Sequence, residues 1–149
     1  MKKGEWVDVC NRELLASITD CHFSPLEICD FGRKASRRSL QAPPLIFLSN
    51  AALLIKVLEW LRSAGGTAPL LVNSWYRDPE YNRIIGGVSN SMHLTCGAAD
   101  IVKVGYGSGE VADTLEDHPD ANLFGLGRYA TFTHIDIRGM IGRTAPARW

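Results

Sequence analysis

The 149-residue chain lacks paired cysteine motifs, long apolar runs and an excess of charge of either sign. No Cys-x-x-Cys pair occurs, which argues against a zinc ribbon or a thioredoxin-type motif. No run of 18 apolar residues occurs, so we expect no membrane span. Lysine plus arginine equals aspartate plus glutamate, at 16 residues each, so a nucleic-acid partner is not expected.

The N-terminus also lacks the apolar core of a signal peptide, because charged residues such as Asp8 soon follow its basic start. We therefore expect a chain that folds in the cytoplasm of the producing cell and needs a separate route of release if it acts outside. In that reducing compartment, we expect buried thiols rather than disulfides at the four cysteines, Cys10, Cys21, Cys29 and Cys96.

Helical patterns are clearest in the first half of the chain. Leucines recur at three and four positions over 50–64, which predicts a helix with one apolar face. Ser49 or Asn50 could cap its start, and Gly65 follows its end. A shorter helix is predicted over about 10–20 from a similar apolar pattern.

Three other segments of the chain have simpler patterns. Ser24, Pro25 and Glu27 together form a helix-start signal, with a cap, a proline at the first helical position and a capping-box carboxylate. Residues 32–44 are basic and polar and are predicted to be a solvated loop. The tail 139–149 shows little periodicity, so we predict no regular element there.

Strand patterns dominate the second half. We predict strands over 69–76, 100–104, 127–129 and 132–138, and a helix over 110–117. The chain has no internal repeats, and helices precede mostly antiparallel strands. We therefore predict a single α+β domain over the whole chain, with a small antiparallel sheet and flanking helices.

The segment 91–100 holds most of the chemistry. It carries His93 and Asp100, with the latter predicted at the start of a strand, and His134 arrives later on another predicted strand. Two imidazoles and one carboxylate leave tetrahedral zinc with one open position, as in a catalytic site. The alternative stays open at this point: His93 would be a polar loop residue and Asp100 a strand cap.

Three further residues, Cys96, His22 and Asp136, need an interpretation. Cys96 lies within the metal segment and is either a rival ligand or, as we favour, a packing residue. His22 is far from that segment and is interpreted as a surface or capping histidine. Asp136 is two residues from His134 and shares its strand face.

These residues belong to a longer set of motifs: Ser74-Trp75-Tyr76-Arg77, Asn82, Gly86-Gly87, Ser91-x-His93-x-x-x-Gly97-x-Ala99-Asp100 and His134-Ile135-Asp136-x-Arg138. In these motifs the chain resembles the zinc D-alanyl-D-alanine carboxypeptidases and related peptidoglycan peptidases, which include VanY-like enzymes and phage endolysin peptidases. The resemblance covers roughly residues 22–138. It implies the fold of that group, whose metal core is shared with lysostaphin-type peptidases and the hedgehog signalling domain.

The resemblance implies roles for six residues. His93, Asp100 and His134 would be the zinc ligands. Arg77 would lie at the rim, where its planar guanidinium could pair with a substrate carboxylate or steady an oxyanion; otherwise it would form a structural ion pair with an acid. The remaining substrate contacts would be Ser91, which could also be a simple turn hydroxyl, and Tyr76.

One departure from the family concerns the proton acceptor. Many relatives carry a glutamate three residues before the second histidine, or a histidine two before it. Here these positions hold Thr131 and Phe132, and neither can act as a general base. Asp136 is the nearest carboxylate in the sequence, either as the catalytic base or as an outer partner that orients an imidazole.

The leading hypothesis is therefore a zinc metallopeptidase that hydrolyses a peptide bond in the peptidoglycan stem peptide. It would be a monomer, acting on the cell wall after release and encoded by a cell or a virus. The alternatives are a catalytically inactive zinc-binding module that grips cell-wall peptide or a protein, and a metal-free structural protein of a phage particle.

Overall fold

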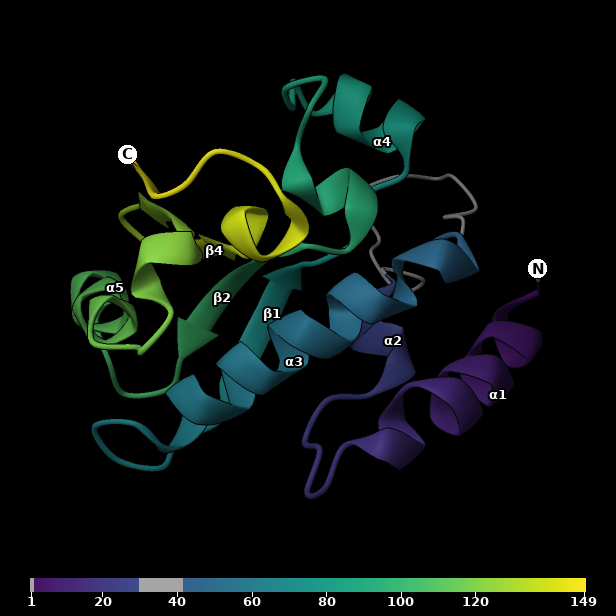
Figure 1. The fold of residues 1–149 in the computed structure, drawn as a ribbon, viewed down its shortest axis with the longest axis horizontal. Helices are drawn as coiled ribbons and strands as arrows, with labels where there is room; N and C mark the ends of the chain where they lie inside the picture. Colours follow the sequence, from purple (N-terminus) through teal and green to yellow (C-terminus); the bar gives the residue numbers. More distant parts are fainter. Residues whose placement is uncertain (1, 30–41) are drawn as a thin grey trace.

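Figure 1 shows the fold as a computed structural model, which describes residues 2–29 and 42–149. Within these residues five strands form one sheet in the order β1-β2-β4-β3-β5. Their bounds are β1 Leu70–Ser74, β2 Ala98–Lys103, β3 Gly125–Arg128, β4 Thr133–Asp136 and β5 Ala147–Arg148. Every neighbouring pair is antiparallel except β3 and β5, which confirms the predicted α+β class.

The helices surround this sheet. They are α1 (Lys3–Glu13), α2 (Pro25–Ile28), α3 (Leu48–Ser63), α4 (Pro79–Ile84) and α5 (Ser108–Glu116), with 3-10 turns η1 (Leu15–Ser17), η2 (Leu45–Phe47), η3 (Met92–Thr95), η4 (Ala121–Leu123) and η5 (Arg138–Ile141). Helix α1 lies at the end of the molecule away from α5, and α2 lies between α1 and the sheet (Figure 1). Over the described ranges, none of the helices has the length and apolarity needed to cross a membrane.

Helix α3 confirms the predicted core helix. Leu54 and Leu58 on its apolar face are fully buried. The helix begins two residues before the predicted start, so the predicted caps were wrong: Ser49 and Asn50 lie in its first turn. The Asn50 side chain instead donates to the carbonyl of Thr95 at 2.9 Å, which ties α3 to η3.

The other end of α3 is fixed by the sheet. Lys103, at the end of β2, is 2 % exposed, and its ammonium donates to the carbonyls of Leu61 at 2.9 Å and Ala64 at 2.6 Å. These carbonyls lie at the C-terminal end of α3, where they have no partner within the helix, so the ammonium satisfies them. Its positive charge also interacts favourably with the negative end of the helix dipole. Gly65 then turns the chain with a φ of 69°.

The first helix differs from its prediction. We predicted a helix over 10–20, but α1 begins at Lys3 and only a 3-10 turn follows it. The apolar stripe begins at Trp6, which is fully buried and donates its indole N–H to the Pro25 carbonyl at 3.2 Å. The predicted helix start at Ser24 is confirmed, because its backbone N–H donates to the Glu27 carboxylate at 2.7 Å.

The sheet also departs from prediction at two places. Strand β2 begins at Ala98 and not at the predicted residue 100, so Asp100 lies inside the strand. The tail forms β5, which no pattern predicted: the Trp149 N–H donates to the Leu126 carbonyl at 3.1 Å. The predicted loop over 32–44 lies largely outside the described residues.

The prediction of buried thiols is confirmed for Cys10 and Cys96 but not for Cys21. Cys10 and Cys96 are fully buried thiols, and Cys21 is a half-buried thiol. Burial raises the pKa of Cys10 to about 12, so this thiol stays protonated at neutral pH and acts as a small apolar side chain.

Candidate metal centre

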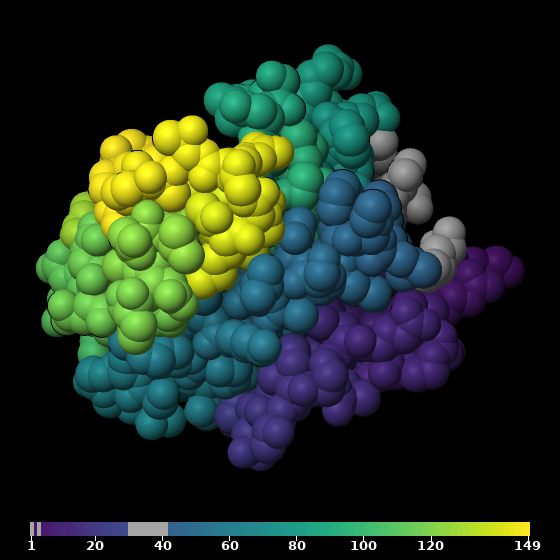
Figure 2. Space-filling view, in the orientation of Figure 1, coloured from purple at the N-terminus to yellow at the C-terminus, as the bar shows by residue number. Residues whose placement is uncertain are grey.

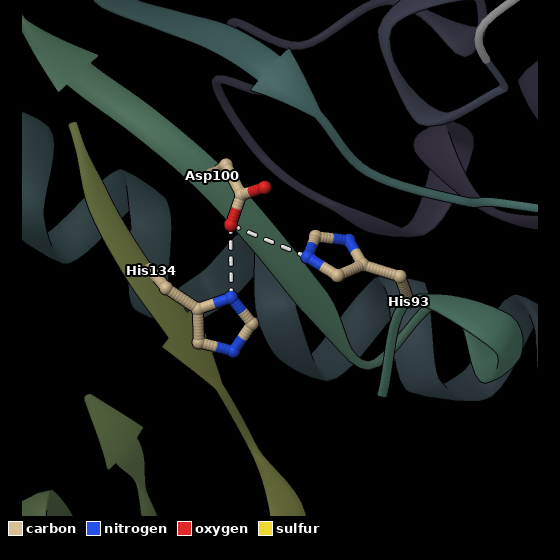
Figure 3. Close-up of side chains that lie close together, drawn as sticks. All are labelled: His93, Asp100 and His134. Carbon is tan, nitrogen blue, oxygen red and sulfur yellow. Dashed lines mark hydrogen bonds and ion pairs between the residues drawn. The ribbon is translucent and has the colours of Figure 1, made fainter. Parts of the chain in front are cut away.

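His93, Asp100 and His134 meet at one point, and their side chains face one another in Figure 3. Asp100 Oδ1 lies 3.2 Å from His93 Nε2 and 2.8 Å from His134 Nδ1. All three donor atoms lie within 4.8 Å of one another, and all three residues are buried. Two imidazole nitrogens and one carboxylate oxygen form a donor set that suits zinc and leaves one position open.

The register of the sheet creates half of this arrangement. Asp100 on β2 is the direct antiparallel neighbour of His134 on β4, so their side chains stand on the same face. The same row continues to Ser74 on β1 and Gly127 on β3. The carboxylate and the second imidazole are therefore placed by backbone pairing rather than by a loop.

The turn η3 supplies the first imidazole. Ser91 caps this turn by accepting the His93 N–H at 3.3 Å. Cys96 then adopts a left-handed conformation with a φ of 57°, and the chain enters β2 through Gly97. A Cβ at Gly97 would lie 2.8 Å from the terminal carbon of Met92, so a larger residue there would displace the end of that side chain.

Each histidine has an outer partner on its second nitrogen. His93 Nδ1 donates to the Trp75 carbonyl at 2.6 Å, which leaves Nε2 as the donor toward the site. His134 Nε2 lies 3.1 Å from Asp136 Oδ2, which leaves Nδ1 toward the site. Partners of this kind fix the tautomer and the orientation of metal-binding imidazoles.

The electrostatics of the site favour an ionised carboxylate. Burial would raise the pKa of Asp100, but its hydrogen bonds with His134 and His93 outweigh burial and hold that pKa well below its usual range. Burial lowers the pKa of His93, against the opposing effect of its hydrogen bond with Asp100. Burial acts in the same direction on His134, but its bonds to Asp100 and Asp136 raise its pKa overall.

Arg77 lies beside the donor set. Its guanidinium forms an ion pair with Asp100 Oδ2 and donates through Nε to the Ser74 hydroxyl at 2.8 Å. Its backbone N–H donates to the His93 carbonyl at 3.1 Å. These contacts match the structural ion pair with an acid and leave less of the guanidinium for a substrate carboxylate.

A cavity of about 470 Å³ opens onto the donor set. Arg77 and Ser91 line it, together with the loop at Gly86 and Gly87. Tyr76 does not: it is 6 % exposed, and burial raises the pKa of its phenol to about 12. The predicted substrate contact of Tyr76 is therefore not supported by its position, whereas Ser91 is both a turn cap and a lining residue.

Two aromatic residues of the cavity wall were not predicted. Tyr129 and Trp149 line the cavity, and the Trp149 indole N–H donates to the Tyr129 hydroxyl at 3.0 Å. The Trp149 ring centroid lies 5.2 Å from that of His134. Gly127 provides the space, because a Cβ there would lie 2.7 Å from the indole nitrogen and 2.9 Å from the Tyr129 ring.

Asp136 is fully buried at the edge of the site. Arg138 donates to both of its oxygens, at 2.9 Å from Nε and 2.7 Å from Nη2. Burial would raise the pKa of Asp136, but the hydrogen bonds from Arg138 and His134 lower it. These contacts favour the role of an orienting partner of His134 over that of a catalytic base.

Two other residues lie outside the centre. His22 is half exposed and pairs with Glu59 at 3.0 Å, in agreement with a surface histidine. Cys96 is not part of the donor group, and its backbone carbonyl accepts the Trp75 indole N–H at 3.0 Å. It is therefore a packing residue, as we expected.

A buried His-Asp-His set at the base of an open cavity is typical of a catalytic rather than a structural metal centre. The chain belongs to the peptidase M15 family, whose sequence model matches residues 21–136. Over 95 residues it is 30% identical to the zinc D-Ala-D-Ala carboxypeptidase of Streptomyces albus G, and the aligned part covers 64% of this chain. The chain spans 37% of the length of that relative. Both comparisons support a metallopeptidase.

Proposed function

We propose that the chain is a zinc-dependent peptidase that hydrolyses a peptide bond in peptidoglycan stem peptides, as a D-Ala-D-Ala carboxypeptidase or a stem-peptide endopeptidase. The observation that carries the proposal is the convergence of His93, Asp100 and His134 at the base of a cavity. The family match supports peptidase chemistry, and the name of the relative suggests the class of substrate.

The residues present fit a zinc ion. His93 Nε2, Asp100 Oδ1 and His134 Nδ1 would hold it, and the outer partners of both imidazoles are already in place. When bound, zinc lowers the pKa of a coordinated water to about 7 and polarises a carbonyl oxygen. The ionised state of Asp100 supplies the negative charge that a divalent cation requires.

Other side chains in the cavity would bind and orient the peptide. Arg77 holds Asp100 in position through its ion pair, and its positive charge faces the cavity. The hydroxyl of Tyr129 accepts from Trp149 and still has its own proton to donate. It could therefore hydrogen-bond a substrate carbonyl, although no pattern in the sequence suggested this residue.

One observation favours a second candidate function. Of the described residues that line the cavity, Asp100 alone is a carboxylate, and it belongs to the donor set. Asp136 is occupied by Arg138, and position 131 holds a threonine. A chain without a proton acceptor would bind zinc and peptide without cleaving it, as a cell-wall-binding module.

The test measures zinc content and the release of products from a stem peptide for the wild type and for His93→Ala. We expect stoichiometric zinc in the wild type and little in the variant. The loss of activity should exceed the roughly 10–100-fold that removal of an outer partner costs. His22→Ala is the matched control, since His22 is half exposed and pairs with Glu59 away from the cavity.

Three results would separate the possibilities. Full activity of His93→Ala would rule out the metal centre as the catalytic site. Zinc and peptide binding by the wild type, without turnover of any stem peptide, would favour the binding module. Turnover that depends on His93 but not on His22 would support the peptidase.

A further inference from the structure

A second cavity, of about 630 Å³, adjoins the metal cavity. The two share Val88, Ser91 and Trp149 as lining residues, so they form a continuous depression. Its walls come from the segment after α4 and from the C-terminal segment, which lie side by side in Figure 2, in teal and yellow. An extended peptide bound at the metal could therefore continue into this space.

The charge of the second cavity is positive. Its charged lining residues are Arg138 and Arg143, and none of its described lining residues is acidic. Arg138 is neutralised by Asp136, to which it donates two hydrogen bonds. Arg143 has no carboxylate partner among the described residues, and its side chain makes one hydrogen bond, to the Asn90 carbonyl at 2.7 Å.

This contact leaves most of the Arg143 side chain available. A guanidinium carries five N–H donors in a fixed plane, and the Asn90 carbonyl uses one of them. The remaining donors suit a carboxylate, which a guanidinium can bind through two parallel hydrogen bonds. Arg77 is less suited to this task, because its guanidinium is already paired with Asp100.

The cavity is also formed in advance of binding. The Arg143 N–H donates to the Arg138 carbonyl at 2.8 Å, and Gly142 makes the preceding turn with a φ of 81°. The guanidinium of Arg138 lies 5.2 Å from the Trp149 ring centroid, so Arg138 contacts the Trp149 ring as well as the Asp136 carboxylate. Preformed walls reduce the entropy that binding would cost.

We propose that this second cavity binds a carboxylate of the peptide substrate, with Arg143 as the recognition residue and Trp149 as the apolar wall beside it. The proposal rests on the proposed function, since it concerns how the same enzyme would recognise a stem peptide. It identifies the substrate as an anionic peptide with a carboxylate one or more residues away from the bond at the metal.

The experiment uses three stem peptides of the same length. The first carries a free carboxylate on an internal residue and another at its C-terminus; the second and third have one or the other converted to an amide. Calorimetry on the zinc-loaded chain gives the dissociation constants, and mass spectrometry reports whether any peptide is cut. We expect one of the two amides to bind the wild type about tenfold more weakly, as for one partly exposed charge-assisted contact.

The variant Arg143→Gln should remove this discrimination. It should bind the acidic peptide as weakly as the wild type binds the sensitive amide, and it should bind that amide unchanged. Because the comparison is made between peptides within one variant, a general loosening of the Asn90 contact would not imitate it. Arg83→Gln is the control, since Arg83 is exposed on α4 and is not a lining residue of either cavity.

The outcomes separate the two proposals. Cleavage of the peptides with equal binding of acid and amides, or discrimination that persists in Arg143→Gln, would overturn the carboxylate site and leave the peptidase intact. If the wild type neither binds nor cuts any of the three peptides, both proposals fail. Discrimination without cleavage would support the site in a binding module.

Discussion

The part of the chain before Ser74 and the part from Ser74 onward bury different kinds of side chains. In residues 2–29 and 42–73, every buried side chain is apolar. All of the buried polar or charged side chains of the described residues lie between Ser74 and Asp136: Ser74, Asp78, Asn82, His93, Asp100, Lys103, Thr133, His134 and Asp136. The first region therefore forms a layer of apolar packing, and the second holds a polar network.

We therefore expect the apolar region to contribute mainly to stability and the polar network mainly to function. Burying a polar group without a partner costs roughly 1–3 kcal/mol in proteins, so a buried network persists only when its members satisfy one another. Around the metal centre each imidazole has two partners. An apolar core is less demanding about geometry, whereas the position of every donor near the metal matters. Variants in the two regions should consequently have different consequences.

Two tryptophans provide the largest test of this comparison. Trp6 and Trp75 are both fully buried and both donate an indole hydrogen bond, but Trp6 packs in the N-terminal layer and Trp75 adjoins the centre. Trp6→Ala and Trp75→Ala should each lower the free energy of unfolding by about 3–5 kcal/mol. Only Trp75→Ala should also weaken zinc binding, by roughly 10–100-fold, because it removes the indole that donates to the Cys96 carbonyl at the end of the turn that carries His93.

Denaturant unfolding and competition with a zinc chelator measure the two effects separately. Trp6→Ala is the control for destabilisation as such, since it has the same loss of core volume without contact with the donor set. Equal zinc affinities in the two variants would contradict the division into two regions.

A second test removes one charge from the polar network. Asp136→Asn keeps the size of the side chain but weakens the hydrogen bond that orients His134 and loses the ion pair with Arg138. We expect zinc affinity to fall by roughly 10–100-fold, as for other outer partners of metal ligands. A chelator competition series at constant pH measures it. If Asp136 were instead the catalytic base, zinc affinity would be preserved and turnover alone would be lost.

Arg148→Gln provides the matched control for that variant. Arg148 forms two hydrogen bonds with the Glu116 carboxylate, at 2.7 and 2.8 Å, in the same fork geometry as Arg138 and Asp136. Both side chains are about one third exposed, so the pair should contribute no more than about 1 kcal/mol to stability. Zinc affinity should not change, because neither residue contacts the donor set.

The sequence predicts the composition of the centre better than its surroundings. His93, Asp100 and His134 could be selected because their residue types and motif spacing restrict the chemistry. Asp100 was nevertheless placed at the start of a strand, since the small residues Ala98 and Ala99 before it have weak strand propensity and pairing with β4 overrides it.

The cavity walls could not be predicted from local patterns. Arg143 is held by its backbone bond to the Arg138 carbonyl, and Trp149 reaches the site only because β5 pairs in parallel with β3. That pairing joins distant segments through a strand of two residues, which is too short for a periodic signal. Gly127 gives no local sign that it makes room for two aromatic rings.

The smallest test compares two helix caps. Ser24 starts α2 in the apolar layer, where its capping box with Glu27 satisfies helix donors. Asp78 starts α4 and accepts from the backbone of Glu80 and Tyr81, at 3.1 and 3.0 Å. Ser24→Ala and Asp78→Ala should each cost about 1 kcal/mol, which lowers the Tm of a chain of this size by about 2–4 °C.

The two caps should differ in a second measurement. Helix α4 leads directly into the loop at Gly86 and Gly87 that lines the metal cavity. The end of α2 instead contacts Tyr76, which does not line that cavity: the Tyr76 N–H donates to the Ile28 carbonyl at 3.0 Å. Asp78→Ala should therefore weaken binding of a stem peptide as well as lowering the Tm, and Ser24→Ala should lower the Tm alone. Thermal unfolding and peptide titration of both variants would test this. Loss of peptide binding in Ser24→Ala would mean that the apolar layer also positions the cavity, and the two regions would then act as one unit.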